Sequence, residues 1–208
     1  RIAKGDPSTA LMWARQCIHS AEIASSPLWR QAVRAEVLHS VLHDGALINA
    51  LRVEPELGTP ARGGMPATRV RRSEGRWLLS GQKIFSTGSS ALSWGIVWGA
   101  TQEDTPHIGQ ILVPLDSPGV RIEKSWYQLG MRASGSDTVI FEDVEIPERY
   151  LIGFDAPPGV ERETSALALW HAILVPALYN AVALSARDWL VTFLKSRTPS
   201  ALGKSLST

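Results

Sequence analysis

The sequence predicts an α+β protein of several domains: a helical segment, an antiparallel β-barrel or sandwich in the middle, and the start of a C-terminal helical bundle. Apolar residues recur at three- and four-residue steps up to about Asn49 and again after about Gly159, which indicates amphipathic helices. Between Arg52 and Ile152 they alternate with a period of two, which indicates strands. We expect domain boundaries that give residues 1–50, 51–155 and 156–208, and the 44% hydrophobic content is enough for a core.

A first helix is predicted to begin at Pro7. Asp6 has a side chain suited to an N-cap, and the missing N–H of Pro7 costs nothing in the first helical turn. One apolar face then follows at helical spacing, made by Leu11, Ala14, Ile18 and Ala21.

A second helix is predicted from Pro27, with Ser26 as its N-cap and Gly45 as the glycine that ends it. Its apolar positions fall four residues apart, at Trp29, Val33, Val37 and Val41. We therefore expect two amphipathic helices joined by a short loop.

Six short strands are predicted in the middle of the chain, separated by clusters of Gly, Pro, Ser and Asp. Because no helix is predicted between them, they favour an antiparallel barrel or sandwich. The segments are 65–72, 75–85, 92–101, 107–115, 119–126 and 136–147.

The last of these strands breaks its own alternation. Val139 and Phe141 are out of phase with Val144 and Ile146. A β-bulge near Glu142-Asp143 would return all four side chains to one face.

The end of the chain predicts one long helix, which Pro176 is expected to kink or break. Its apolar residues, at three- and four-residue steps, include Leu167, Trp170, Leu174, Leu178, Val182 and Trp189. A helix this apolar needs partners, which we expect from further helices or from another subunit. Because the chain begins at Arg1 without an initiator methionine, we expect it to be an internal piece of a longer protein.

The charge balance argues against nucleic acid and membranes as partners. A net charge of +1 is far from the strong positive surplus that nucleic acids and anionic membranes select. We expect no apolar run that approaches the length of a membrane span, and no signal peptide. Cys17 is the one cysteine, which excludes an intramolecular disulfide and suits a reducing cytoplasm.

His39 and His43 lie four residues apart on the second predicted helix, beside Asp44. This spacing resembles a metal-binding pair, but a zinc site needs a third and usually a fourth ligand. We interpret the pair as solvated histidines near a helix C-terminus, where positive charge is favoured, and expect no metal.

Two loops have the composition of a ligand site. "VEPELGTPARGG" (53–64) has no periodicity and exposes backbone amides that can bind polar ring edges or phosphate. "GQKIFSTGSS" (81–90) places Phe85 beside Ser86 and Thr87, an edge suited to a flat cofactor that forms hydrogen bonds. Each loop alone also fits an ordinary linker or hairpin.

Three segments together are more specific. "EPELG", "GRWLLSGQKIFSTG" and "GVRIEKSWYQLGMRASGSDTVIFEDVEIP", in this order, resemble the acyl-CoA dehydrogenase superfamily over nearly the whole chain. The resemblance implies an N-terminal helical domain, a middle β-domain and a C-terminal four-helix bundle. This chain would hold the end of the first, all of the second and the start of the third.

The resemblance also implies a flavin, FAD or alternatively FMN, bound against the β-domain. Carried over by position, the backbone around Val53 and the loop at Thr59 would face the flavin ring and the substrate. Phe85, Ser86 and Thr87 would line the other edge of the ring.

Two further regions take a role from the resemblance. Arg197 matches an arginine that reaches the flavin pyrophosphate across a subunit interface, which implies a homo-tetramer or homo-dimer formed through the C-terminal bundle. Gly130 to Asp137 predicts a turn between strands, and Arg132 and Ser134 would lie along the substrate channel.

The sequence departs from the usual acyl-CoA dehydrogenase loop. Val53 stands where threonine is common, 58–60 replaces glycine-serine-aspartate, and Gly88 replaces the asparagine after the threonine. These changes resemble the branch of dibenzothiophene-desulfurising monooxygenases, which use reduced flavin, usually FMN, and oxygen on small apolar substrates.

Three functions remain open from the sequence. The first is oxidation of an acyl-CoA by removal of an α-proton and transfer of a β-hydride to flavin. The second is a reduced-flavin monooxygenase acting on a small substrate, and the third is a flavin-free scaffold module. The resemblance implies that the catalytic base lies in the C-terminal bundle, beyond Thr208, so the sequence leaves the catalytic residue unknown.

Overall fold

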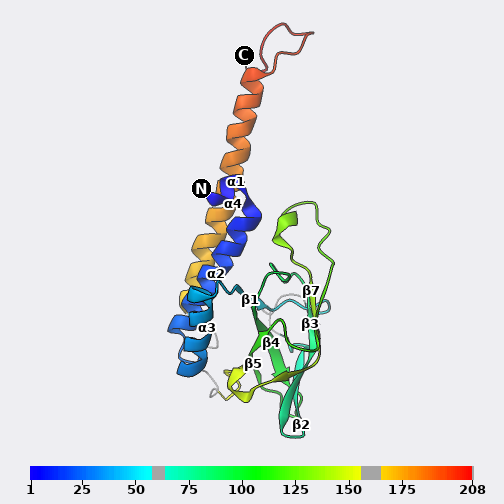
Figure 1. Ribbon diagram of the computed structural model, residues 1–208. Helices are drawn as coiled ribbons and strands as arrows, with labels where there is room; N and C mark the ends of the chain where they lie inside the picture. The colour runs from blue at the N-terminus through cyan, green and yellow to red at the C-terminus, as the bar shows by residue number, and fades with distance from the viewer. Residues whose placement is uncertain (58–63, 156–164, 208) are drawn as a thin grey trace.

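The computed structural model describes residues 1–57, 64–155 and 165–207. The helices lie together on one side of the molecule and the strands form a sheet beside them (Figure 1). The chain therefore runs from helices through a β-region to a long helix, as the sequence predicts.

The helices are α1 (Ile2–Gly5), α2 (Pro7–Ser25), α3 (Gln31–His43) and α4 (Ser165–Ser196), with two short 3-10 helices, η2 (Arg132–Ser134) and η3 (Glu148–Tyr150). The strands are β1 (Ile48–Leu51), β2 (Arg69–Ser73), β3 (Arg76–Lys83), β4 (Trp94–Thr101), β5 (Ile108–Pro114), β6 (Val120–Glu123), β7 (Thr138–Ile146) and β8 (Leu151–Ile152).

The start of α2 follows the prediction. The carboxylate of Asp6 accepts hydrogen bonds from the backbone N–H groups of Ser8 at 3.0 Å and Thr9 at 3.1 Å, and Pro7 is the first residue of the helix. These bonds satisfy donors that the first helical turn leaves unpaired.

The predicted start of the second helix is wrong. Ser26 is the C-cap of α2, and α3 begins only at Gln31, after a turn that contains Pro27. The Ser26 N–H bonds to the Glu22 carbonyl and so completes the preceding helix. The end of α3 is as predicted, because Gly45 follows the C-cap with φ +69°, a conformation that glycine adopts without strain.

The sheet is mixed, which corrects the expectation of a purely antiparallel one. Its strand order is β6-β7-β3-β2-β4-β5-β8, and β1 also pairs with β4. Both β1 and β2 run parallel to β4, whereas the other pairs are antiparallel. β1 was not predicted, because its four residues fall at the end of the region interpreted as helical.

The predicted bulge in β7 is confirmed. Leu79 pairs with Val144 and Gly81 with Phe141, so Glu142 and Asp143 together stand opposite Ser80. The shift buries all four apolar side chains of β7, namely Val139, Phe141, Val144 and Ile146.

The core is made mostly by residues of the strands. It joins Ile23, Trp29, Val33 and Val37 from the helical region to the buried strand residues. A hydrogen bond also connects β4 to α3, since Trp94 donates from Nε1 to Ser40 Oγ at 3.0 Å.

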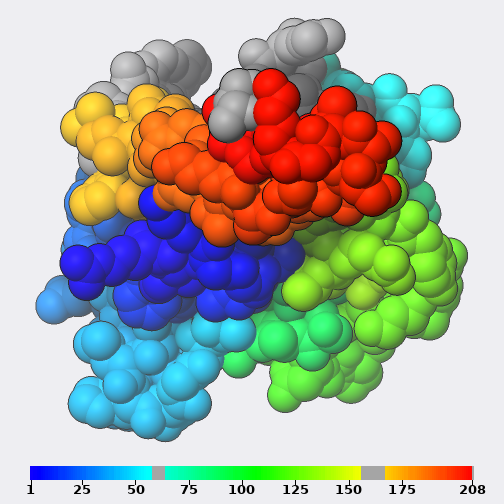
Figure 2. Space-filling view, turned by 90° about the horizontal axis from the view of Figure 1, so that it is seen from above, coloured from blue at the N-terminus to red at the C-terminus, as the bar shows by residue number. Residues whose placement is uncertain are grey.

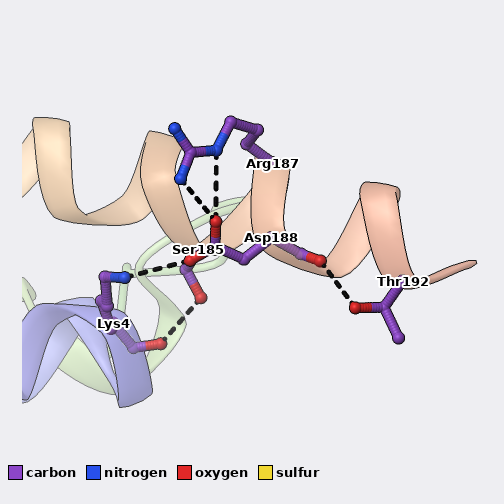
Figure 3. Close-up of polar contacts among 5 residues, drawn as sticks. All are labelled: Lys4, Ser185, Arg187, Asp188 and Thr192. Atoms are coloured by element: carbon purple, nitrogen blue, oxygen red, sulfur yellow. Dashed lines mark hydrogen bonds and ion pairs between the residues drawn. The ribbon is translucent and has the colours of Figure 1, made fainter.

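Helix α4 is continuous through Pro176 and packs along α1 and α2, as Figure 2 shows from above. Two contacts connect it to α1 (Figure 3): Lys4 Nζ lies 3.1 Å from Asp188 Oδ2, and Ser185 Oγ donates to the Lys4 carbonyl at 3.1 Å. Both groups of the ion pair are half-exposed, so the pair contributes little stability.

The segment Leu167–Ser196 of α4 is long and apolar enough to cross a membrane, by length and composition alone. This corrects the expectation that no apolar run approaches that length. Its contacts with α1 and α2 cover little of it, since 11% of its most apolar window is buried.

The close approach of two strands at Gly81 generates a stability prediction. Gly81 has φ +145°, and a Cβ there would lie 2.6 Å from Thr68 Oγ1 and 2.7 Å from Thr68 Cα. We expect Gly81→Ala to lower the free energy of unfolding of the intact gene product by about 3 kcal/mol or more, from backbone strain plus overpacking. Chemical denaturation measures the loss.

Gly75→Ala is the matched control. Gly75 also has a positive φ, +79°, but nothing lies within 4 Å of an added Cβ. We expect only the backbone cost, about 1 kcal/mol. Equal losses for the two variants would contradict the packing argument at Gly81.

Candidate functional site

A pocket of about 370 Å³ lies between the helices and the sheet. Its lining comes from α2, β1, the segment after β1, the segment after β3, and α4. The lining residues are Arg15, His19, Asn49, Ala50, Arg52, Val53, Ile84, Phe85, Thr87 and His171.

Three of the residues predicted to bind the cofactor meet in this pocket: Val53, Phe85 and Thr87. The backbone brings them together, because the Ile84 N–H donates to the Val53 carbonyl at 2.9 Å. The Thr87 carbonyl in turn accepts a hydrogen bond at 2.9 Å from Nδ2 of Asn49 on β1.

Phe85 combines an uncommon backbone conformation with a partly exposed side chain. Its φ is +55°, uncommon for a non-glycine residue, and 55% of it is exposed. Its ring meets the ring of Trp126 edge to face, with the centroids 6.0 Å apart. A partly exposed aromatic ring at the edge of a pocket suits a flat heteroaromatic ligand.

Ser86 is buried beneath the pocket rather than in its lining. Its N–H donates to the Asp137 carbonyl at 3.2 Å, and its hydroxyl donates to the Lys83 carbonyl at 3.4 Å. In this structure Ser86 therefore fixes the loop that carries Phe85 and Thr87.

The predicted substrate residues Arg132 and Ser134 lie in η2, which packs beside α2. Arg132 is exposed. Ser134 is buried; its hydroxyl lies 2.8 Å from Ser136 Oγ, and its carbonyl accepts from the Gly88 N–H at 2.8 Å. These bonds make Gly130 to Asp137 a compact turn that supports the loop at Thr87.

One other predicted cofactor residue, Arg197, is not brought to the pocket within this chain. Arg197 follows the end of α4, 26 residues after His171, which for a helix corresponds to roughly 40 Å. Thr59 lies outside the described residues.

The residues next to Val53 and Ile84 in the chain, Glu54 and Lys83, form a buried ion pair. Lys83 Nζ and Glu54 Oε1 are 2.6 Å apart, and the two residues are 0% and 2% exposed. The Glu54 carboxylate also accepts from the N–H groups of Ala67 at 2.6 Å and Thr68 at 2.9 Å. One carboxylate thus connects the segment after β1, the end of β3 and the start of β2.

Both members of this pair are charged at neutral pH. Burial raises the pKa of Glu54, but hydrogen bonds from Lys83 and Thr68 outweigh it and lower that pKa to about 2. Burial lowers the pKa of Lys83 to about 8, although Glu54 opposes the shift.

Sequence reasoning missed the polar residues that the helices contribute, Arg15, His19 and His171. Arg15 and His19 are four residues apart, next to Ala14 and Ile18 of the predicted apolar face. The sequence did contain a signal for them on the first helix, where a cation and a histidine stand beside the apolar stripe.

A metal is not supported by the described residues. Among them, no group of three or more His, Cys, Asp or Glu side chains could hold a metal ion. His39 and His43 are exposed on α3, with ring centroids 4.5 Å apart.

The comparisons with known proteins agree with this architecture. The model of the acyl-CoA dehydrogenase middle domain matches residues 52–144. A protein of Bacillus subtilis (strain 168) named "Putative acyl-CoA dehydrogenase YdbM" is 34% identical over 202 residues, which are 97% of this chain and 51% of that protein. The chain belongs to the acyl-CoA dehydrogenase superfamily. It spans about half the length of that relative.

Solved structures of superfamily members share the fold. A glutaryl-CoA dehydrogenase from Mycobacterium smegmatis in complex with FADH2 has a TM-score of 0.71 and 24% identity, and the match covers 98% of this chain and 50% of that one. TdsC from Paenibacillus sp. A11-2, in complex with FMN and indole, has a TM-score of 0.75 and 19% identity, with 98% and 52% covered. Both kinds of flavin therefore occur on this fold.

The buried ion pair generates a second prediction. We expect Glu54→Gln to lower the free energy of unfolding of the intact gene product by about 3–5 kcal/mol, because it leaves Lys83 charged and buried without its partner. The double variant E54Q/K83M should recover most of this loss. Chemical denaturation of both variants tests the pair, and a double variant no better than the single one would contradict it.

The same pair predicts an acid dependence. Because the pKa of Glu54 is lowered from 4.5 to about 2 on folding, its contribution to stability is complete above pH 4.5 and is lost as the pH falls toward about 2. E54Q should lack this part of the acid dependence. Melting temperatures measured from pH 6 to pH 2 would show the two curves converging; parallel curves would contradict it.

Proposed function

We propose that the intact gene product is a flavin-dependent oxidoreductase that oxidises an acyl-CoA thioester. The observation that carries the proposal is the convergence of Val53, Phe85 and Thr87 on one pocket of a superfamily β-domain. The 34% identity to a protein named as an acyl-CoA dehydrogenase supports the choice of substrate.

The described residues fit a flavin ring. A flavin needs an aromatic or apolar surface and polar groups at its polar edge, and the pocket offers Phe85, Val53 and Ile84 beside Asn49 and Thr87. We propose FAD as the cofactor, with FMN as the alternative. When bound, the flavin supplies the capacity to accept a hydride.

The chain's own residues supply binding and orientation. The Ile84–Val53 backbone bond and the Glu54–Lys83 pair hold the two lining segments in register, and Ser86 fixes the loop between them. Proton removal beside a thioester needs a positioned base. No carboxylate is among the described residues that line the pocket, and we propose that the base comes from beyond Thr208.

A second candidate is a reduced-flavin monooxygenase. The specific observation in its favour is the polar helical wall of the pocket, where a plain fatty acyl chain would meet Arg15, His19 and His171. The departures at Val53 and Gly88 point to the same branch.

Cofactor retention is the first test. We expect the intact gene product to keep FAD or FMN after removal of free cofactor, seen as flavin bands in its visible spectrum. Phe85→Ala should weaken flavin binding about tenfold, the loss of one aromatic contact of about 1.4 kcal/mol. Tyr127→Ala, at an exposed aromatic outside the pocket lining, is the control and should bind normally.

Reactions of the intact gene product can distinguish dehydrogenation from monooxygenation. Bleaching of the flavin by an acyl-CoA without oxygen supports dehydrogenation. No bleaching, but oxygen-dependent conversion of a small substrate by the reduced protein, supports the monooxygenase. A well-folded intact protein without any flavin would contradict both.

We further propose that the distal part of α4 forms a subunit contact in a homo-tetramer or homo-dimer. It carries exposed apolar residues, including Trp189 and Phe193, whose rings stack with centroids 5.2 Å apart. Exposed aromatic clusters of this kind are typical of interfaces.

The contact can be tested by mutation. We expect W189E/F193E to reduce the intact gene product to a smaller assembly in analytical ultracentrifugation, because two charges would be buried without partners. Leu42→Glu, on an exposed position of α3, is the control and should leave the assembly unchanged. Unchanged sedimentation of the double variant would contradict the interface.

A further inference from the structure

The helical wall of the pocket carries a positive charge to which no role has been assigned. Arg15 and His19 come from successive turns of α2, and His171 comes from α4, opposite the β-domain residues that would bind flavin. These three side chains therefore line the pocket from the helices, and the proposed flavin-binding residues line it from the β-domain.

Arg15 forms a hydrogen bond with His171, and its guanidinium has further N–H donors available to a ligand. One of its terminal nitrogens, Nη1, lies 2.7 Å from His171 Nε2. His171 Nδ1 lies 2.9 Å from the Leu167 carbonyl, which can only accept, so Nδ1 carries a proton and donates. A neutral His171 then accepts from Arg15 at Nε2. This is the one hydrogen bond that the described residues give the guanidinium, which has five N–H donors.

No carboxylate balances Arg15 within the described part of the chain. The charged and titratable groups that act on it are Arg52, which has the same sign, and Tyr179. Together with burial, Arg52 lowers the pKa of Arg15. Lys83, the other buried cation near this pocket, has Glu54 at 2.6 Å. A partly buried cation without a counter-ion costs free energy that an incoming anion would offset.

His19 adds a second unsatisfied group. It is 3% exposed, and its Nε2 makes no hydrogen bond within the described residues. Burial lowers its pKa to about 3, helped by the charge of Arg15 and opposed by a side-chain hydrogen bond with Asn49, so it is neutral at physiological pH. A neutral imidazole next to a guanidinium can donate one hydrogen bond to an oxygen atom of a ligand.

We propose that Arg15 and His19 bind a carboxylate at the far end of the substrate, so that the enzyme acts on an acyl group that ends in a carboxylate. The site suits this chemistry because an arginine fork pairs with two carboxylate oxygens, and the neighbouring His19 can donate a further hydrogen bond. This inference rests on the proposed function for its substrate but not for the anion itself.

Binding of a simple acid tests the anion site without turnover. Hexanoate and its neutral analogue hexanamide are titrated into the intact, flavin-loaded gene product by calorimetry. We expect hexanoate to bind about 10- to 100-fold more tightly, the worth of charged hydrogen bonds. Arg15→Met should remove this preference, Arg15→Lys should retain part of it, and Arg30→Met, at an exposed arginine, should leave it intact.

Turnover then tests the substrate. Adipoyl-CoA and hexanoyl-CoA have the same number of acyl carbons, and only the first ends in a carboxylate. We expect wild type to have the higher kcat/KM for adipoyl-CoA, and Arg15→Met to shift the ratio toward hexanoyl-CoA by about 10- to 100-fold. Flavin content and melting temperature identify any variant that fails to fold, in which case Arg15→Lys gives the comparison.

Several outcomes would overturn the proposal. Equal affinity of wild type for hexanoate and hexanamide would remove the anion site. Inorganic phosphate binding more tightly than hexanoate would make it a phosphate site instead. Loss of flavin in wild type, or no turnover of either acyl-CoA, would contradict the proposed function, while the calorimetric comparison would still decide the anion site.

Discussion

The buried pair of Glu54 and Lys83 is the constraint on which the pocket depends. It joins three segments that are separate in sequence, and each must stay in register for the carboxylate to receive all its donors. A buried carboxylate this fully bonded stays ionised, and its ionisation keeps the lysine charged. The position of Val53 beside Ile84 follows directly, because Val53 precedes Glu54 and Ile84 follows Lys83. The ion pair therefore helps to fix the two segments that carry Val53 and Ile84.

Local signals made the strands and the bulge predictable. The phase change in β7 is visible in the sequence because a buried face tolerates only one register, and the structure meets it with two residues opposite Ser80. β1 was not predictable in this way. It has four residues and pairs in parallel with β4, which lies more than forty residues further along the chain, so its existence depends on a partner that local periodicity cannot reveal.

The candidate site was also predictable from the sequence only in part. Phe85 and Thr87 were found because the loop motif carries them, and Val53 because the motif fixes its place. Arg15, His19 and His171 were missed because helix periodicity explains each of them as part of an amphipathic surface. Only the packing of α2 against both α4 and β1 brings them to the same pocket. Ser134, by contrast, has the sequence context of a site residue but is bonded within its own turn.

The electrostatics of the pocket bear on either proposed chemistry. Arg15 and Arg52 both lower the pKa of His19, and Arg52 also lowers that of Lys83, so their positive potential extends across the pocket from α2 to β3. The pair of Glu54 and Lys83 is nearly neutral as a unit and does not cancel this potential. A low-dielectric pocket with a fixed positive potential stabilises negative charge that is bound or that develops within it, without reorganising at the moment of reaction. The anion site that we propose at Arg15 would therefore favour acidic substrates over plain hydrocarbon chains in either reaction.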